Sequence, residues 1–471
     1  MIRTSNIGYC THKQWLFRSG PKHVFPVALV MALFGQPNGL YLYFPMYQVS
    51  ITIIILFFIF SIIVSKMVRG NLTIPNINLS LPLVLFLVFS CFSLIYAPNP
   101  AYGARILFSM FFKVLFFFGI VTVCNQVKDL RSLLGIITLL GVVFSIQGLL
   151  LVGGVSLFGL QASGRINEEV GFGLIDNNYA LYNYGLLGFA KTYIFIGDIT
   201  IPRCQSMFTE PGFFANFLEL SIFSTLAWTH MQRTLHKGKC YAIVGIQLLA
   251  LFFSLSTAGW FSVGTSFFVY ALIIAREQLS KLFMYVFYIM FFVSLCFIIL
   301  YFSFPSSLDK IYQVTWVEKF ESQQRGTTSA EQRVDSINNT LNLFAQKPLF
   351  GWGIAQMAVK IGTVTNNVLV QTAGELGIVG LIIYITMLAT IFKTMLDSIF
   401  ITHKRKHLSI ALPSYWIICC VIAFLTHFMF LSTNWSFFYW IALAILYVNR
   451  RLLTSEELYA ASIYKKNELH T

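Results

Sequence analysis

The chain has 471 residues, of which 57% are hydrophobic and only 11% are charged, and its mean hydropathy is +0.73. Soluble domains carry roughly 25% charged residues, so the sequence lacks the polar surface that a water-soluble fold needs. The formal net charge is +14, yet no basic patch interleaved with aromatic residues accompanies it, which excludes nucleic acid as a partner. The composition predicts an all-α, polytopic transmembrane helical bundle.

Apolar runs of spanning length predict about twelve membrane spans, and the whole chain, 1–471, is expected to form a single integral membrane domain. In chain order the expected spans are 24–41, 44–65, 81–97, 105–124, 133–152, 212–230, 240–256, 258–275, 282–304, 373–395, 411–431 and 434–449.

The orientation follows from the positions of lysine and arginine. With twelve spans, most of these residues fall in the connections on one side, for example Lys66, Arg131, Lys239 and Arg405. Because cytoplasmic loops carry an excess of positive residues, both termini are expected in the cytoplasm. The net positive charge is then explained by topology and by attraction to anionic membrane lipids.

Two connections on the opposite side, 153–211 and 304–372, are far longer than ordinary loops. Loops longer than roughly 15 residues are usually functional or disordered, so chemistry is expected here. The first loop is expected to lie partly in the interface as a re-entrant or surface helix. The second contains a run at 330–347 whose apolar residues recur at helical spacing, which predicts a helix that ends at Pro348. Arg333 lies one turn before Ile337 on this helix, so we expect it to point inward beside the apolar stripe.

A few polar residues near the outer ends of the spans could carry chemistry. Arg203 and Glu210 precede Pro211, which opens a span, and the alternative for them is a snorkelling arginine and a helix-capping glutamate. Glu219 lies within the same span, where an acidic group costs about 2.5–3.5 kcal/mol, so it should face a cavity or a partner. His427 also lies within a span and is expected to be a hydrogen-bonded packing residue. Neither the histidines nor the cysteines have metal-ligand spacing, and no Walker loop is present, so no cofactor is expected.

Three segments of the second loop form a pattern. Arg333 to Pro348 is followed by Leu349-Phe-Gly-Trp-Gly353, and then by Asn366-Asn-Val-Leu-Val-Gln-Thr-Ala-Gly-Glu-Leu-Gly-Ile-Val-Gly380. This pattern resembles the C-terminal signature of the O-antigen polymerase/O-antigen ligase superfamily. In addition, Ser206–Pro211 resembles the element before a middle span of the polymerases, and Ser254–Gly259 resembles the break between the two spans that follow.

The resemblance implies a GT-C-like glycosyltransferase that transfers glycans from undecaprenyl diphosphate at the periplasmic face of the bacterial inner membrane, without metal or nucleotide. Its partners would be the lipid-linked oligosaccharide donor and acceptor and membrane lipids, with a chain-length regulator as an open question. Carried over here, Arg203 and Arg333 would bind and neutralise the diphosphate, and Glu210 is the nearest matched carboxylate if a base is needed. Gly351, Gly353, Asn366 and Asn367 would line the substrate site.

One departure bears on the reaction. Ligases typically have His-Asn where this chain has Asn366-Asn367, and an amide cannot act as a general base at neutral pH. The sequence therefore favours a polymerase of lipid-linked repeat units over a ligase that transfers glycan to lipid A core. A flippase or other transporter is a further alternative, but it predicts internal repeats and charges near mid-membrane. A purely structural protein would not need arginines beside the glycine-rich turn.

Overall fold

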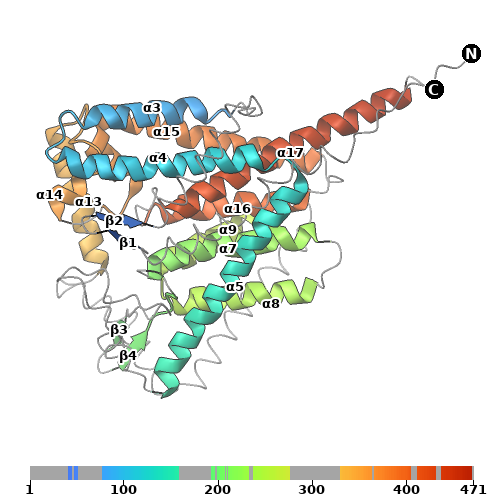
Figure 1. The fold of residues 1–471 in the computed structure, drawn as a ribbon, viewed down its shortest axis with the longest axis horizontal. Helices are drawn as coiled ribbons and strands as arrows, with labels where there is room; N and C mark the ends of the chain where they lie inside the picture. The colour runs from blue at the N-terminus through green and yellow to red at the C-terminus, as the bar shows by residue number, and fades with distance from the viewer. Residues whose placement is uncertain are drawn as a thin grey trace, which may run out of the picture.

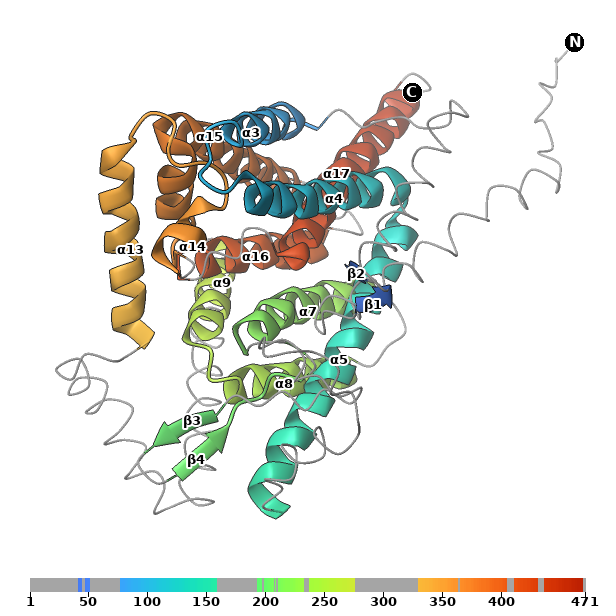
Figure 2. The same ribbon diagram turned by 60° about the vertical axis from the view of Figure 1, so that its left-hand side comes forward.

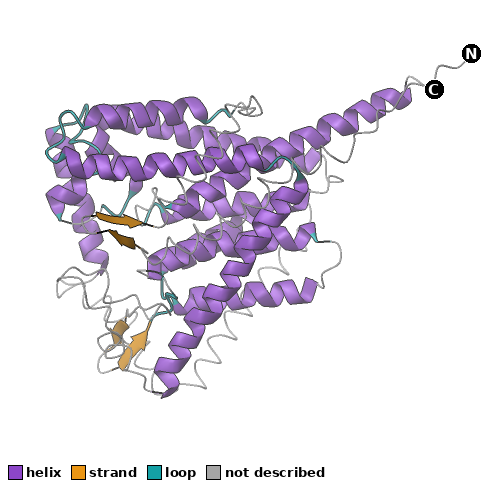
Figure 3. Cartoon of the chain, in the orientation of Figure 1, coloured by secondary structure: helices purple, strands orange, loops and turns teal. Residues whose placement is uncertain are grey.

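The computed structural model describes residues 41–44, 47–50, 77–158, 193–196, 199–206, 208, 211–232, 237–275, 329–362, 365–404, 411–430 and 436–468. Within these residues the chain is a helical bundle with two short β-hairpins (Figures 1 and 3). The expected helical fold class is thus confirmed. The expected spans 24–41 and 282–304 lie almost wholly or wholly outside the described residues.

The first hairpin corrects one expected span. Strands β1 (Tyr41–Phe44) and β2 (Tyr47–Ser50) pair antiparallel, with Tyr41 opposite Ser50. The start of the span expected at 44–65 is therefore wrong, because 47–50 is a strand. Aromatic and β-branched residues favour strands, and Pro45 between the two strands is unfavourable inside a helix.

Three helices follow: α3 (Ser80–Ser93), α4 (Pro100–Val123) and α5 (Val127–Phe158). They correspond to the expected spans 81–97, 105–124 and 133–152, with different ends. Helix α4 begins at Pro100 because proline suits the first helical position and the Asn99 side chain accepts a hydrogen bond from the Tyr102 N–H at 3.1 Å. Helix α5 continues to Phe158, which shortens the first long loop.

That first long loop contains the second hairpin. Strands β3 (Tyr193–Ile196) and β4 (Ile199–Pro202) pair antiparallel across the two residues Gly197 and Asp198. The surface helix expected in this loop is therefore wrong at 193–202. A Gly-Asp pair between β-branched and aromatic runs is a hairpin signal, so the sequence did carry the information.

Helix α7 (Pro211–Met231) is the centre of the bundle, and α5, α8 (Lys237–Phe253), α9 (Thr257–Ala275) and α16 (Ala411–His427) pack around it. Most of its side chains are buried. The α5–α7–α8 contact is partly polar, because Gln247 Nε2 donates to Ser221 Oγ at 2.9 Å and lies 3.1 Å from Thr225 Oγ1.

The C-terminal part consists of α13 (Ser329–Gln346), the short α14 (Gln356–Ile361), α15 (Val368–Lys404), α16 and α17 (Phe437–Glu468). The helix expected at 330–347 is confirmed as α13. It runs across the end of the bundle, transverse to α3, α4 and α16 (Figure 2). Helix α17 continues well past the span expected at 434–449 and projects from the bundle (Figure 1).

Four helices in the described part are long and apolar enough to cross a membrane: Pro100–Val123, Val127–Leu150, Thr257–Ile274 and Val368–Lys404. Shorter apolar helices are Ser80–Ser93, Gly238–Phe253 and Ala411–His427. The chain is a membrane protein by this criterion, whereas the number of spans and the orientation of the termini stay predictions.

Candidate functional site

The glycine-rich turn of the second loop is bound to a break in α15. The Trp352 N–H donates to the Gly374 carbonyl at 3.1 Å, and the Gly353 N–H donates to the Glu375 carbonyl at 2.7 Å. In return, the Ile378 N–H donates to the Pro348 carbonyl at 2.8 Å. Two segments of the motif that are apart in sequence therefore form one backbone unit.

The glycines of this unit are required by geometry. Gly351, Gly353 and Gly377 have φ of +70°, +102° and +66°, a region that favours glycine. A Cβ on Gly351 would lie 2.5 Å from the Glu375 carbonyl carbon, and one on Gly377 would collide with the Leu349 carbonyl. The predicted substrate-binding role of Gly351 and Gly353 stays a prediction. Their backbone role is a sufficient reason for the residue type.

The buried Glu375 side chain belongs to the same unit. Its carboxylate accepts hydrogen bonds from the Gln371 side chain at 2.9 Å and from the Ala355 backbone N–H. Ala355 has a left-handed backbone, with φ of 62°. The glutamate of the motif thus holds the turn that follows Gly353.

Helix α13 packs on α15 through small polar residues. Ser336 and Thr340 are buried, while Val334 is 55% exposed and Leu341 is 44% exposed. A Cβ on Gly374 would lie 2.6 Å from the Thr340 methyl group, so this glycine allows close approach. The apolar stripe is therefore not buried as a whole, since Val334 and Leu341 are exposed. At a membrane interface the apolar side of a helix can face lipid, so polarity does not identify its buried face.

Arg333 lies in the first turns of α13 and is half-buried. Its backbone carbonyl accepts a hydrogen bond from Ser336 Oγ at 2.9 Å. Among the described residues, no hydrogen bond or ion pair is made by its guanidinium. Its positive charge is therefore available at this end of the bundle.

Asn366 and Asn367 lie where α13, α15 and the end of α16 meet. Asn366 Nδ2 lies 3.3 Å from Ser336 Oγ, which links it to α13. Asn367 caps α15, because its Oδ1 accepts hydrogen bonds from the N–H groups of Leu369 and Val370 at 3.0 and 3.1 Å. The sequence reading did not anticipate this capping role.

Arg203 is attached to the turn between α8 and α9. Its Nε donates to the Ser254 carbonyl at 2.9 Å, and its Nη2 donates to the Leu255 carbonyl at 3.1 Å. Leu255 has a left-handed backbone with φ of 51°, which is costly for a leucine. The arginine therefore stabilises the turn, and its charge is fixed beside the start of α9.

Cys204 follows Arg203, and it is fully buried. Burial raises the pKa of the Cys204 thiol, so the group stays protonated near neutral pH and cannot serve as a nucleophile. Glu210, the carboxylate matched to the family pattern, lies outside the described residues.

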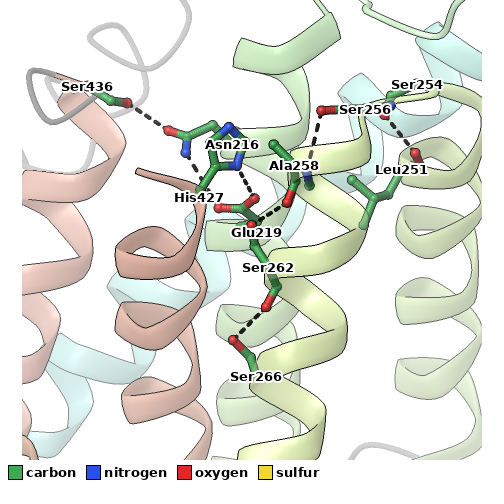
Figure 4. Close-up of polar contacts among 11 residues, drawn as sticks. Asn216, Glu219, Leu251, Ser254, Ser256, Ala258, Ser262, Ser266, His427 and Ser436 are labelled. Atoms are coloured by element: carbon green, nitrogen blue, oxygen red, sulfur yellow. Dashed lines mark hydrogen bonds and ion pairs between the residues drawn. The ribbon is translucent and has the colours of Figure 1, made fainter. Parts of the chain in front are cut away.

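The main finding that sequence reasoning missed is a contact between Glu219 of α7 and His427 of α16 (Figure 4). Glu219 Oε1 lies 2.5 Å from His427 Nδ1, and both side chains are fully buried. The expectation that Glu219 needs a partner and that His427 makes a hydrogen bond is confirmed. That they partner each other could not be read from two residues so far apart in sequence.

Further polar groups extend this contact to two more helices (Figure 4). The Ser262 hydroxyl of α9 lies within hydrogen-bonding reach of the Glu219 carboxylate. Asn216 Nδ2 lies 3.5 Å from Glu219 Oε2, and Ser436 Oγ, just before α17, donates to Asn216 Oδ1 at 2.9 Å. Helices α7, α9, α16 and α17 therefore meet at one buried polar cluster.

Fold and site together define a polytopic helical membrane protein with cationic and buried acid–base groups at one end of its bundle. Residues 242–385 match the family model described as O-antigen ligase, which supports the resemblance of this part of the chain to the O-antigen polymerase/ligase superfamily. The superfamily comprises membrane enzymes of glycosyl transfer, and it implies lipid-linked glycan substrates. The matched segment contains Arg333, Asn366, Asn367 and the glycine-rich turn that is bound to α15. Arg203 and Glu219 precede it. A comparison with curated protein sequences returns no match.

Proposed function

We propose that this protein polymerises undecaprenyl-diphosphate-linked O-antigen repeat units at the periplasmic face of the bacterial inner membrane. The observation that carries the choice of polymerase is the pair Asn366-Asn367 where ligases have His-Asn. An amide cannot take a proton at neutral pH. Asn366, which stands in place of the histidine, bonds Ser336 Oγ of α13 at 3.3 Å, which supports a structural role for this position.

In the proposed reaction, a sugar hydroxyl of the acceptor attacks the anomeric carbon of the donor glycan. The bond between that carbon and the diphosphate oxygen breaks, and undecaprenyl diphosphate leaves with the bonding electron pair. The hydroxyl proton passes from the acceptor to a base, for which Glu210 is the proposed residue. Because the leaving group is an anion, fixed positive charge beside it stabilises the transition state.

Arg203 and Arg333 are the proposed sources of that charge. Arginine suits a diphosphate because its planar guanidinium donates parallel hydrogen bonds and stays charged at all relevant pH values. Arg333 makes no described side-chain contact in the protein, and Arg203 is held by the α8–α9 turn. The Arg333 side chain would adjust its position to the substrate, whereas the Arg203 side chain would keep a fixed position. Glu210 is kept as the proposed base for the acceptor.

The second candidate function is ligation of the glycan to lipid A core, and the description of the matching family model favours it. A deletion strain analysed by lipopolysaccharide gel separates the two functions. Loss of a polymerase leaves core carrying one repeat unit, whereas loss of a ligase leaves bare core. A flippase defect would instead leave single repeat units on the cytoplasmic side of the membrane.

A further inference from the structure

The buried pair of Glu219 and His427 lies between the parts of the protein that carry the two proposed diphosphate-binding arginines. On one side, Arg203 bonds the carbonyls of Ser254 and Leu255 at the α8–α9 turn. Ser256 in the same turn accepts a hydrogen bond from the Gly259 N–H in the first turn of α9 at 3.4 Å. Ser262 of α9 lies beside the Glu219 carboxylate, and its hydroxyl donates to the Ala258 carbonyl of its own helix.

On the other side, the chain of contacts leads to Arg333. His427 is the last residue of α16, and the carbonyl of the next residue, Phe428, accepts a hydrogen bond from the Val368 N–H at 3.2 Å. Val368 is the first residue of α15. Asn366 and Asn367, which precede Val368, extend this connection toward Arg333.

Asn367 Nδ2 lies 3.4 Å from the Met429 carbonyl, which ties the start of α15 to the end of α16. Asn366 bonds Ser336 Oγ at 3.3 Å, and Ser336 donates to the Arg333 carbonyl at 2.9 Å. Hydrogen bonds, joined by short stretches of backbone, thus link the Arg203 side of the bundle to the Arg333 side, with the Glu219–His427 pair between them.

A buried acid–base pair at this position needs a reason. Desolvation of two ionisable groups is expensive, and apolar residues of similar size often serve stability equally well. What such a pair supplies in the best-attested cases is a unique register between helices. A second ion pair in the described residues, Arg450 with Asp397, is partly exposed and joins the middle of α17 to the C-terminal part of α15.

We infer that Glu219 and His427 are positioning residues that hold the Arg203 side of the bundle in register with the Arg333 side, so that both arginines reach one diphosphate. This inference rests on the proposed function. Direct proton transfer from the acceptor sugar is the competing role. His427 Nε2 has no partner among the described residues, but both side chains are fully buried, so a sugar hydroxyl has no access to them.

The test measures binding of undecaprenyl diphosphate to the full-length protein in lipid nanodiscs. Glu219→Ala and His427→Ala should each raise the Kd at least tenfold. The double variant Glu219→Gln/His427→Gln can form an amide–amide hydrogen bond between α7 and α16 without a titratable group, so its Kd should stay within threefold of that of the parent. Asp397→Asn breaks the distant ion pair and is the matched control, with an unchanged Kd.

Thermal unfolding of each variant is recorded alongside. If the alanine variants aggregate, Glu219→Leu/His427→Leu replaces them, because it keeps the volume and removes the contact, and the same tenfold loss is expected. The inference is overturned if the alanine or leucine variants bind with the parental Kd. It is also overturned if the double glutamine variant binds normally but forms no glycan product, since that result assigns a proton-transfer role.

Arg203→Gln and Arg333→Gln distinguish failure of this inference from failure of the proposed function. If they bind undecaprenyl diphosphate as the parent does, or if the parent does not bind it, the diphosphate site and the inference that rests on it are both wrong. If they lose binding while the alanine variants of the pair do not, only the positioning role is wrong.

Discussion

The Glu219 carboxylate of α7 and the His427 imidazole of α16 lie 2.5 Å apart, and both side chains are fully buried. Removal of one member would leave the other buried without its partner, at a cost of about 3–5 kcal/mol. We therefore expect Glu219→Ala and His427→Ala to lose stability by about this amount. Glu219→Leu/His427→Leu should recover most of it, because no polar group is left unpaired.

Thermal unfolding of the purified variants in one detergent measures these effects. Ser266→Ala is the control, since this buried hydroxyl bonds only the Ser262 carbonyl of its own helix among the described residues. Equal losses for the single alanine variants and the double leucine variant would contradict the cost of an unpaired buried group, because the leucine pair leaves no polar side chain without its partner.

Gly377→Ala should disrupt the backbone unit that the glycine-rich turn forms with the break in α15. Gly377 has φ of 66° and ψ of −166°, a conformation that is essentially restricted to glycine and costs other residues about 1–3 kcal/mol. The added methyl group would also collide with the Leu349 carbonyl. The expected result is loss of both stability and activity.

Gly362→Ala is a control for positive φ without a collision, in a milder left-handed conformation with ψ of 3°. Gly362 has φ of +70° as well, but its Cβ would enter open space. Thermal unfolding should show a clearly smaller loss for this variant than for Gly377→Ala. Equal losses would mean that backbone conformation alone accounts for the effect and that the contact with Leu349 is unimportant.

The two arginines should differ in their effect on stability. Arg203→Ala removes two hydrogen bonds to the α8–α9 turn, and bonds to charged groups contribute on the order of 1.5–3 kcal/mol each. Arg333→Ala removes no hydrogen bond or ion pair among the described residues, so it should lose clearly less stability than Arg203→Ala. Both variants should lose activity. Equal stabilities in a thermal unfolding assay would contradict the anchoring of Arg203.

Cys204 should resist alkylation in the folded protein. Burial raises the pKa of its thiol, so the reactive thiolate form is scarce at and below the usual pKa of a cysteine and becomes populated only at more alkaline pH. A variant that keeps Cys204 as its only cysteine should react with a membrane-permeant maleimide only after unfolding. Rapid labelling of the folded variant at neutral pH would contradict the buried placement.

The main helices were predicted well from local signals, whereas the two β-hairpins were missed although their signals are local as well. Helix α13 was expected from apolar spacing and from Pro348, and the main helices from runs of spanning length. The buried face of α13 could not be predicted. Ser336 and Thr340 are buried against α15, while Val334 and Leu341 are exposed. In a membrane protein apolar residues are stable against lipid as well as against protein, so hydrophobicity does not separate the two.

Long-range polar contacts could not be predicted from the sequence, for a different reason. Glu219 could be recognised as a residue in need of a partner, because its burial is costly. His427 is more than 200 positions away, and no periodicity links the two. Likewise, the positive φ of Gly351 could be suspected from the glycine-rich pattern, but its contact with the backbone of Glu375 depends on how α15 breaks at Gly377.

The central claim, polymerisation of lipid-linked repeat units with Arg333 at the diphosphate, is tested most directly by complementation of a deletion strain with Arg333→Ala and analysis of its lipopolysaccharide on a gel. The parental protein should restore a full ladder of repeat lengths. The variant, expressed at parental level, should give core carrying a single repeat unit. A full ladder from the variant would contradict the role of Arg333, and bare core in the deletion strain would contradict polymerase function.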